Sequence, residues 1–275
     1  MTTFQPGTTP LTQRSFRVVD ARKLLRRRTR DARRQFLAEG PQAVREALGS
    51  GAVVEVFGTQ EAFTRHIELA AAAAQADVRV TLVTEGGLAS LADTVTPQGI
   101  VAVCRHMDAE LPESVMLAAV LDGVSDPGNA GTVLRTADAA GADVVVFPDA
   151  TVDPYNPKCV RASVGSLFHL PVLRGGDTVD HLATLRMAGA TVLAADAHGN
   201  VDLDDCVDDG TLRGPTAWLF GSEARGLPED IATSADRRVK VPVYGRAESL
   251  NLATAAAVCL YASAREHRKE RRSHV

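Results

Sequence analysis

The fold of this chain is decided by the stretch Leu219-Phe220-Gly221-Ser222-Glu223-Ala224-Arg225-Gly226-Leu227-Pro228, together with the segment Val241-Pro242-Val243 through Ser249-Leu250-Asn251-Leu252-Ala253. An apolar, strand-like run precedes each loop, and a helix-like segment follows it. Gly221 and Gly226 allow the backbone to come close to a ligand, with positive φ where it is needed. Ser249 is a favourable N-cap residue for the Ala-rich helix that follows. Two loops rich in backbone donors at strand ends predict a ligand crevice in an open α/β sheet.

The residue pattern of these two loops resembles the motifs of a known family, the SpoU/TrmH-type RNA 2′-O-ribose methyltransferases of the SPOUT superfamily. In that family the first loop reads F-G-x-E-x-x-G and the second reads I-P-M-x-x-x-x-x-S-L-N-V-x-x-A. A third motif, N-x-G-x-x-x-R-T-A, is present here as Asn129, Gly131, Arg135, Thr136 and Ala137. The spacing of the glycines alone favours ordinary strand-to-helix turns. The resemblance to the family rests instead on three motifs that occur in order over residues 115–265.

Composition places the chain among ordinary globular proteins. It has 275 residues, enough for two domains, with 45% hydrophobic and 23% charged residues. The formal net charge is -4, so attraction to RNA must come from a local basic patch. The four cysteines are far apart and show no metal-binding spacing, which predicts reduced thiols in a cytoplasmic protein and no metal site. No signal peptide and no membrane-spanning run are visible.

The N-terminal part predicts a small α/β/α domain. Strand-like runs at residues 35–39, 53–57, 78–83 and 99–104 alternate with helix-like segments. The wording of residues 36–40 and 96–102 resembles the substrate-binding domain found in many members of the family, which is similar to a ribosomal-protein L30e-like fold. We therefore expect a flexible tail at 1–14, an RNA substrate-binding domain at 15–106, a linker at 107–114 and a methyltransferase domain at 115–275.

A basic stretch opens the N-terminal domain, with nine Arg and Lys residues between positions 17 and 34 and only two aspartates among them. Val18, Ala21, Leu24 and Leu25 give it a helical apolar stripe. Charge runs are usually solvated helix faces, but so many like charges repel one another unless a polyanion is close. We therefore expect RNA contacts here and, by a further motif match, at one residue of the second domain. The predicted contacts are Arg26, Arg27, Arg28, Arg30 and Arg161.

The second domain predicts a mostly parallel sheet with right-handed crossovers. A continuous apolar run at 115–121 is typical of a strand buried on both faces. Further strands are expected at 144–147, 170–173, 191–195, 218–220 and 239–243. The acidic stretch at 202–209 is interpreted as a solvated loop. The resemblance implies that the C-terminal segment is threaded into a trefoil knot, which would place the two loops side by side.

A cofactor site follows from the same loops. The G-x-G-x-x-G fingerprint and the Walker A loop are both absent, which disfavours ordinary dinucleotide and P-loop folds. The resemblance implies S-adenosylmethionine, bound in the knot mainly by backbone groups. By motif matching we expect contacts from Gly221, Gly226, Val241 and Leu250, with Ala194 and Ala195 as neighbours.

Five polar residues are the predicted catalytic set: Asn129, Arg135, Glu223, Ser249 and Asn251. Transfer to a ribose hydroxyl needs that hydroxyl aligned and its proton removed. A guanidinium is a poor base, so Arg135 is expected to orient the target and to stabilise developing alkoxide charge, with a base role left open. Glu223 is a candidate to hold Arg135 or a group of a second subunit, Ser249 to cap the helix, and Asn251 to bond the target nucleotide or a knot loop.

These features predict an S-adenosylmethionine-dependent methyltransferase of structured RNA. Ribosomal RNA is the favoured substrate, with transfer RNA, an antibiotic-resistance role in rRNA methylation, and a catalytically idle RNA-binding protein as alternatives. A nucleotide-dependent oxidoreductase is disfavoured by the missing fingerprint. The resemblance also implies a homodimer in which the partner subunit completes each site, and the last helix carries an apolar stripe of Leu252, Ala256, Leu260 and Ala264.

Overall fold

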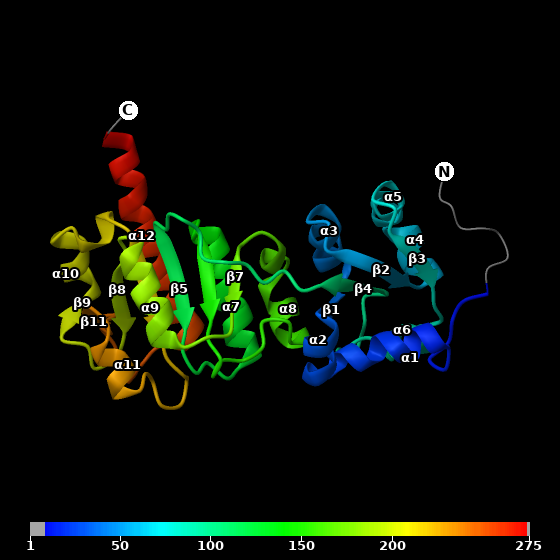
Figure 1. Cartoon of the computed structure of the whole chain (residues 1–275), viewed down its shortest axis with the longest axis horizontal. Coiled ribbons are helices and arrows are strands. Elements are labelled where there is room, and N and C mark those ends of the chain that lie inside the picture. Colours follow the sequence, from blue (N-terminus) through cyan, green and yellow to red (C-terminus); the bar gives the residue numbers. More distant parts are fainter. Residues whose placement is uncertain (1–8, 274–275) are drawn as a thin grey trace. The chain divides into compact units, whose positions relative to one another are not determined.

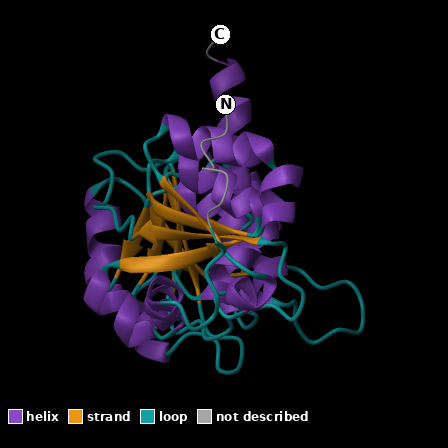
Figure 2. Ribbon diagram, turned by 90° about the vertical axis from the view of Figure 1, so that its right-hand side faces the viewer, coloured by secondary structure: helices purple, strands orange, loops and turns teal. Residues whose placement is uncertain are grey.

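The computed structural model describes the backbone of residues 9–273 and the side chains of residues 9–269. Within this range the chain forms two compact units. One contains residues up to 107 together with 155–169, and the other contains 108–154 together with the residues from 170 onward (Figure 1). Each unit combines helices with a β-sheet (Figure 1), and Figure 2 distinguishes helices, strands and loops by colour. Residues 1–8 of the predicted tail lie outside the described residues, whereas Leu11 forms an isolated β-bridge with Val83.

The first unit is built on a four-stranded sheet with the order β1-β4-β2-β3. Strand β4 pairs antiparallel with β1 and with β2, and β2 pairs parallel with β3. The helical stretch from Gln60 to Gln75 is interrupted at His66, whose φ of -120° and ψ of 55° are not helical. The strands are β1 (Gln35–Glu39), β2 (Val53–Gly58), β3 (Arg79–Leu82) and β4 (Ile100–Arg105), and the helices between them are α3 (Pro41–Gly49), α4 (Gln60–Arg65), α5 (Ile67–Gln75) and α6 (Glu85–Ala89).

The basic stretch forms two short helices rather than one. They are α1 (Phe16–Arg22) and α2 (Arg27–Arg33), joined by the 3₁₀ turn η1 (Lys23–Leu25). The apolar side chains of Val18 and Leu24 are buried in one core cluster with Leu37 of β1 and Val101 of β4. The predicted apolar stripe therefore packs into the core, and most of the basic residues occupy the remaining faces of these helices.

Residues 155–169 interrupt the sequence of the second unit but belong to the first unit. They contain α8 (Pro157–Ser163) and the 3₁₀ turn η2 (Ser166–Phe168). The ring of Tyr155 lies 4.7 Å from that of Phe36 on β1 and 4.0 Å from that of His106, and Phe168 lies 5.9 Å from Phe36. Because these aromatic contacts bury Tyr155 completely, residues 155–169 extend the core of the first unit.

The second unit confirms the predicted mostly parallel sheet, because all its strand pairs are parallel. Its order is β7-β6-β5-β10-β8-β11-β9. The strand expected at 239–243 lies slightly earlier, and residues 241–243 leave the sheet. The strands are β5 (Leu117–Leu121), β6 (Val144–Phe147), β7 (Val172–Arg174), β8 (Thr191–Ala195), β9 (Val201–Asp202), β10 (Thr216–Phe220) and β11 (Arg237–Lys240).

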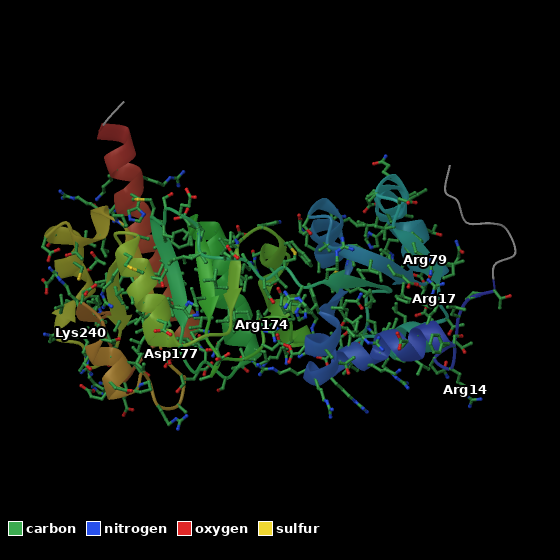
Figure 3. The ribbon with its side chains drawn as sticks, viewed as in Figure 1. Arg14, Arg17, Arg79, Arg174, Asp177 and Lys240 are labelled. Atoms are coloured by element: carbon green, nitrogen blue, oxygen red, sulfur yellow. The ribbon has the colours of Figure 1, made fainter. Side chains whose placement is uncertain are left out.

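Helices cover both faces of this sheet. Leu182 and Leu185 of α9 pack with Val120, Val146 and Leu219. On the opposite face, Trp218 donates a hydrogen bond from Nε1 to Ser263 Oγ of α12 at 2.9 Å. Asp177 caps the start of α9 (Figure 3). The helices are α7 (Pro127–Ala140), α9 (Thr178–Met187), α10 (Leu203–Asp208), the turn η3 (Thr211–Arg213), α11 (Glu229–Thr233) and α12 (Leu252–Ser273).

The acidic stretch at 202–209 is not the predicted loop, because it forms the end of β9 and the helix α10. Asp202 is the N-cap residue of a capping box, in which Asp205 Oδ2 in turn accepts a hydrogen bond from the Asp202 N–H at 3.3 Å. Carboxylates at a helix start are stabilised by its free N–H groups. Lys240 of β11 lies 3.5 Å from Asp202 (Figure 3), so part of the negative charge is balanced locally.

Two further properties concern the described residues only. No helix among residues 9–273 is long and apolar enough to cross a membrane. No group of three or more His, Cys, Asp or Glu side chains in that range is arranged to hold a metal ion. The four cysteines are free and buried, and burial raises the pKa of the Cys104, Cys206 and Cys259 thiols.

Candidate functional site

A pocket of about 800 Å³ lies in the second unit at the carboxyl ends of β8, β10 and β11. Ligands of open α/β sheets bind at this edge. The loops after β10 and after β11 form most of its wall. The structure brings nine of the residues predicted for the site into this lining: Asn129, Ala195, Gly221, Glu223, Gly226, Val241, Ser249, Leu250 and Asn251.

Two predicted residues lie elsewhere. Ala194 is fully buried in the core cluster that packs against α9. Successive residues of a strand face opposite sides, so Ala195 lines the pocket and Ala194 does not. Arg135 is an exposed residue of α7 outside the pocket lining, and its side chain makes no hydrogen bond or ion pair within residues 9–269.

The loop after β10 folds back on itself. Ser222 and Gly226 exchange two backbone hydrogen bonds, of 3.0 and 2.9 Å. A Cβ atom on Gly221 would lie only 2.4 Å from the carbonyl carbon of Gly226, so no other residue fits at position 221. Gly226 has a φ of 66°, which favours glycine. The two motif glycines are thus required by the closure of the loop itself.

A chain of hydrogen bonds joins the three motifs at the pocket wall. Asn251 Nδ2 donates to Asn129 Oδ1 at 3.2 Å, and Asn129 Nδ2 donates to Glu223 Oε1 at 3.0 Å. Glu223 also accepts hydrogen bonds from the backbone N–H groups of Ser125 and Asp126, both at 3.2 Å. Residues more than 90 positions apart in the chain therefore share one polar network.

Two helix caps lie beside the network, and the cap of α12 differs from the prediction. Asp126, followed by Pro127, caps α7 by accepting from the Asn129 N–H at 2.8 Å, which leaves the Asn129 side chain available to Glu223. Asn251 caps α12 by accepting from the Ala253 N–H at 2.9 Å. Ser249 is therefore not the cap. It is exposed at the pocket rim, where its hydroxyl has no partner among the described residues.

The charge of Glu223 is set by its hydrogen bonds. Burial raises the pKa of this carboxyl, but the bonds from Asn129 and from the backbone of Ser125 and Asp126 outweigh it and lower the pKa. Glu223 is therefore ionised at neutral pH and is a weak proton acceptor. Its place in the network suits positioning: it holds the Asn129 amide and joins the loop after β10 to the start of α7.

Sequence reasoning missed an ion-pair group on the same pocket. Asp196, just after β8, accepts two hydrogen bonds from the guanidinium of Arg238, at 3.0 and 2.7 Å. Arg238 also donates to Glu229 at 2.7 Å. Burial raises the pKa of Asp196, and hydrogen bonds from the His198 N–H and from Arg238 lower it overall. Only the pairing of β8 with β11 brings these residues together, so no local signal could have revealed them.

The predicted RNA contacts in the first unit divide into two groups. Arg26, Arg27 and Arg28 are exposed, and Arg27 lies 3.7 Å from Asp31. The prediction for Arg30 is wrong, because its side chain is only 2% exposed and donates to the backbone carbonyls of Leu24 and Leu25 at 3.0 Å. A guanidinium held in this way supports the turn between α1 and α2.

Other basic residues are also engaged within the first unit. Arg17 points toward the sheet, where it pairs with Glu55 and donates to Thr81 Oγ1 at 2.8 Å (Figure 3). Arg33 makes two hydrogen bonds of 2.8 Å with Asp20. Arg161 lies between Glu39, at 3.4 Å, and Asp93, at 3.0 Å. The like charges of the basic stretch are therefore partly balanced without a polyanion.

Family models match both parts of the chain. Residues 116–261 match the SpoU rRNA Methylase family. Residues 16–102 match the MRM3-like substrate binding domain.

Individual proteins are similar over nearly the whole length. The chain is 33% identical over 245 residues to the 23S rRNA (guanosine(2553)-2'-O)-methyltransferase RlmP of Bacillus subtilis, covering 89% of this chain and 94% of that protein. The structure of an AdoMet-bound rRNA methyltransferase from Sinorhizobium meliloti superposes with a TM-score of 0.79 at 31% identity, covering 94% of this chain and 98% of the other. The AdoMet complex of the SpoU methyltransferase AviRb from Streptomyces viridochromogenes gives a TM-score of 0.79 at 30% identity, covering 93% and 99%.

Proposed function

The chain belongs to the SpoU rRNA methylase family, and from this membership we propose that it transfers the methyl group of S-adenosylmethionine to a ribose 2′-hydroxyl of ribosomal RNA. The observation that carries the proposal is the network of Asn129, Glu223 and Asn251 on the wall of the pocket. An intact network argues against an idle RNA-binding protein. The rRNA names of the relatives favour rRNA over the alternative substrate, transfer RNA.

The pocket fits the cofactor. Its volume of about 800 Å³ is within the range of small-molecule sites, roughly 300 to 1,000 Å³. Val241 and Leu250 offer apolar contacts, and the turn from Gly221 to Gly226 offers backbone groups. When bound, S-adenosylmethionine supplies an electrophilic methyl group on a positively charged sulfonium. The ionised Glu223 carboxylate contributes complementary negative charge to the same pocket.

The residues of the network then have separable roles. Glu223 and Asn251 hold the Asn129 amide in one orientation, because it donates to the carboxylate and accepts from Asn251. The second N–H of each asparagine amide is free to bind the ribose or phosphate of the target nucleotide. Ser249, at the rim, offers a hydroxyl for contact with RNA. The protein thus aligns the hydroxyl for attack.

We propose that the site is completed by a second copy of the chain. Arg135 lies outside the pocket of its own chain, although its motif partner Asn129 lines it. Exposed apolar residues on α12, Val258 at 39% and Tyr261 at 52%, suit a homodimer contact. In a dimer, Arg135 of one copy would serve the pocket of the other, where its cation would meet the ionised Glu223.

The experiment mixes two inactive variants, Arg135→Ala and Glu223→Ala. If Arg135 acts across the dimer, half of the randomly formed dimers have one intact site. About one quarter of the wild-type rate of tritium transfer to rRNA should return. Each variant alone is the control. A mixture that stays inactive after verified subunit exchange contradicts the shared site. A wild-type protein that binds cofactor but labels no RNA contradicts the proposed function.

The first unit is proposed as the RNA substrate-binding domain, over residues 15–106, with a linker at 107–114 and the methyltransferase domain from 115. Arg22, Arg26 and Arg28 support this, because their side chains are exposed and have no partner among residues 9–269. The trefoil knot is likewise a proposal. It is supported by the chain crossing from β10 over β8 to β11 and returning to α12, which packs on α7. An rRNA substrate and buried thiols favour a location in the cytoplasm. The buried thiols also favour a mechanism that uses no metal ion.

A further inference from the structure

A second, smaller pocket lies entirely within the first unit. Its volume is about 270 Å³. The carboxyl end of β1, the start of α3, the loop 93–98 and α8 form its walls. None of the catalytic motifs contributes to it.

The walls of this pocket are held in place by a buried carboxylate. The Glu39 side chain is 7% exposed. It accepts hydrogen bonds from the Asp93 N–H at 3.1 Å and from the Thr94 hydroxyl. Arg161 connects Glu39 with Asp93. The loop is therefore fixed before any ligand binds, which lowers the entropic cost of binding.

Two polar side chains of the pocket have no partner among residues 9–269. They are the Gln98 amide and the Thr96 hydroxyl. Gln98 lies across Gly40, since a Cβ atom at position 40 would be 2.8 Å from Gln98 Oε1. Gly40 also has a φ of 96°. An amide placed over a glycine, with both its donor and its acceptor free, is arranged to bind a group that has both.

Apolar side chains of the lining accompany these polar groups, among them Val164, which is 41% exposed. Val95, next to the lining residues Thr94 and Thr96 in the sequence but outside the lining, is fully exposed, at 103% of its reference area. Val164 has a φ of 50°, a left-handed conformation that is strained for a β-branched residue. This conformation ends α8, where Val164 is the C-cap residue. The pocket thus combines apolar surfaces with amide and hydroxyl groups.

The charges around the pocket favour an uncharged ligand over a phosphate. Arg161 is shared by two carboxylates, so the predicted role of Arg161 as a phosphate contact is not supported by its surroundings. An uncharged, planar group with donors and acceptors at its edge fits better. Unpaired bases of RNA have these properties and are read through their edges when they are splayed out of a loop.

We propose that this pocket binds one unpaired nucleobase of the substrate RNA, with Gln98 and Thr96 contacting its edge and Val164 its face. The proposal rests on the function proposed above. The first unit then recognises one unpaired nucleotide in addition to presenting a basic surface to the RNA.

The first test compares Gln98→Ala with the control Gln75→Ala, an exposed amide at the end of α5 outside the pocket. Loss of one or two hydrogen bonds should raise KM for rRNA by about five- to tenfold and leave kcat and the Kd for S-adenosylmethionine unchanged. The control should match the wild type. A KM for Gln98→Ala equal to that of the wild type overturns the proposal, whereas an inactive wild type would refute the methyltransferase function itself.

The second test locates the contact directly. All four natural cysteines are buried, so Val95→Cys provides an accessible thiol for an azidophenacyl photo-crosslinker. Ile67→Cys, at a residue 59% exposed on α5, is the matched control. With rRNA as the probe, Val95→Cys should crosslink to one unpaired nucleotide and Gln98→Ala in the same chain should weaken that crosslink. Crosslinks spread evenly over the RNA, or formed only with a ribosomal protein in ribosomal particles, would overturn the proposal.

Discussion

Two glutamates, Glu223 and Glu39, hold a loop in place in the two units, but their charges are balanced differently. Glu223 follows β10 and accepts from the backbone of Ser125 and Asp126. Glu39 ends β1 and accepts from the backbone of Asp93. Glu39 also pairs with Arg161, whereas Glu223 has no cation among the described residues of its own chain.

The difference teaches how a structural carboxylate can be distinguished from one at a functional site. The Glu39 group is closed, which here means that its negative charge is paired with a cation of the same unit, Arg161. The Glu223 group is held by amides and N–H groups, which stabilise the charge without cancelling it. It therefore leaves a negative site that a bound cation, or Arg135 of a second copy, can complete.

The largest expected effect is that of Glu223→Ala. Without the carboxylate, the Asn129 amide and the N–H groups of Ser125 and Asp126 lose their acceptor, so the pocket wall is no longer preorganised. We expect kcat to fall about 100-fold, as when one preorganised polar group is removed from an active site. The measurement is single-turnover methyl transfer to rRNA at saturating cofactor.

Glu229→Ala is the matched control, because Glu229 lines the same pocket and pairs with Arg238 but lies outside the network. It should change kcat by less than about threefold. Equal losses in the two variants would show that general pocket charge, and not the network, is responsible.

The sequence predicted the network members but not how they connect. Asn129, Glu223 and Asn251 were identified through motifs, and the parallel sheet through apolar runs. A local signal for the α7 cap was present although no cap was predicted there: Asp126 before Pro127 is a typical N-cap followed by proline at N1. Asn251, one residue before the helix, is likewise a better N-cap candidate than Ser249.

The remaining errors concern contacts between distant segments. The repulsion expected in the basic stretch ignored Glu55, which belongs to β2 and meets Arg17 only after folding. The pairing of Asp196 with Arg238 depends on the register of β8 and β11. Arg30 was placed on the surface because a charge run does not reveal which side chain turns inward toward free carbonyls. These features follow from tertiary structure and not from local pattern.

A smaller effect is expected from Arg161→Ala, which would test whether the Glu39 group is closed. Removing the guanidinium leaves a largely buried carboxylate without its cation. We expect a loss of about 1–2 kcal/mol in the free energy of unfolding, less than for a fully buried pair because Arg161 is partly exposed. Urea denaturation measures it. Arg65→Ala removes an exposed pair with Glu61 and should cost less than about 0.5 kcal/mol. Similar costs for the two variants would contradict a closed group.

The smallest effect is a dependence of thermal stability on pH. It distinguishes Glu223, a carboxylate held by amide and N–H groups, from Asp209, a carboxylate paired with a cation. Hydrogen bonds lower the pKa of Glu223 below its usual 4.5, so its ionised form stabilises the fold above that pH and the contribution is lost as the pH falls. The difference in Tm between the wild type and Glu223→Gln should shrink below about pH 4.5. Asp209, bonded to Thr211 and Arg237, has a pKa of about 2, so the Asp209→Asn difference should persist to lower pH. Added salt should weaken the Asp209 difference, since it screens an exposed ion pair, and it should weaken the Glu223 difference only where the proposed dimer brings Arg135 to that carboxylate. Equal salt dependence of both differences would mean that Glu223 has a cationic partner in solution, as a dimer carrying Arg135 to it would provide.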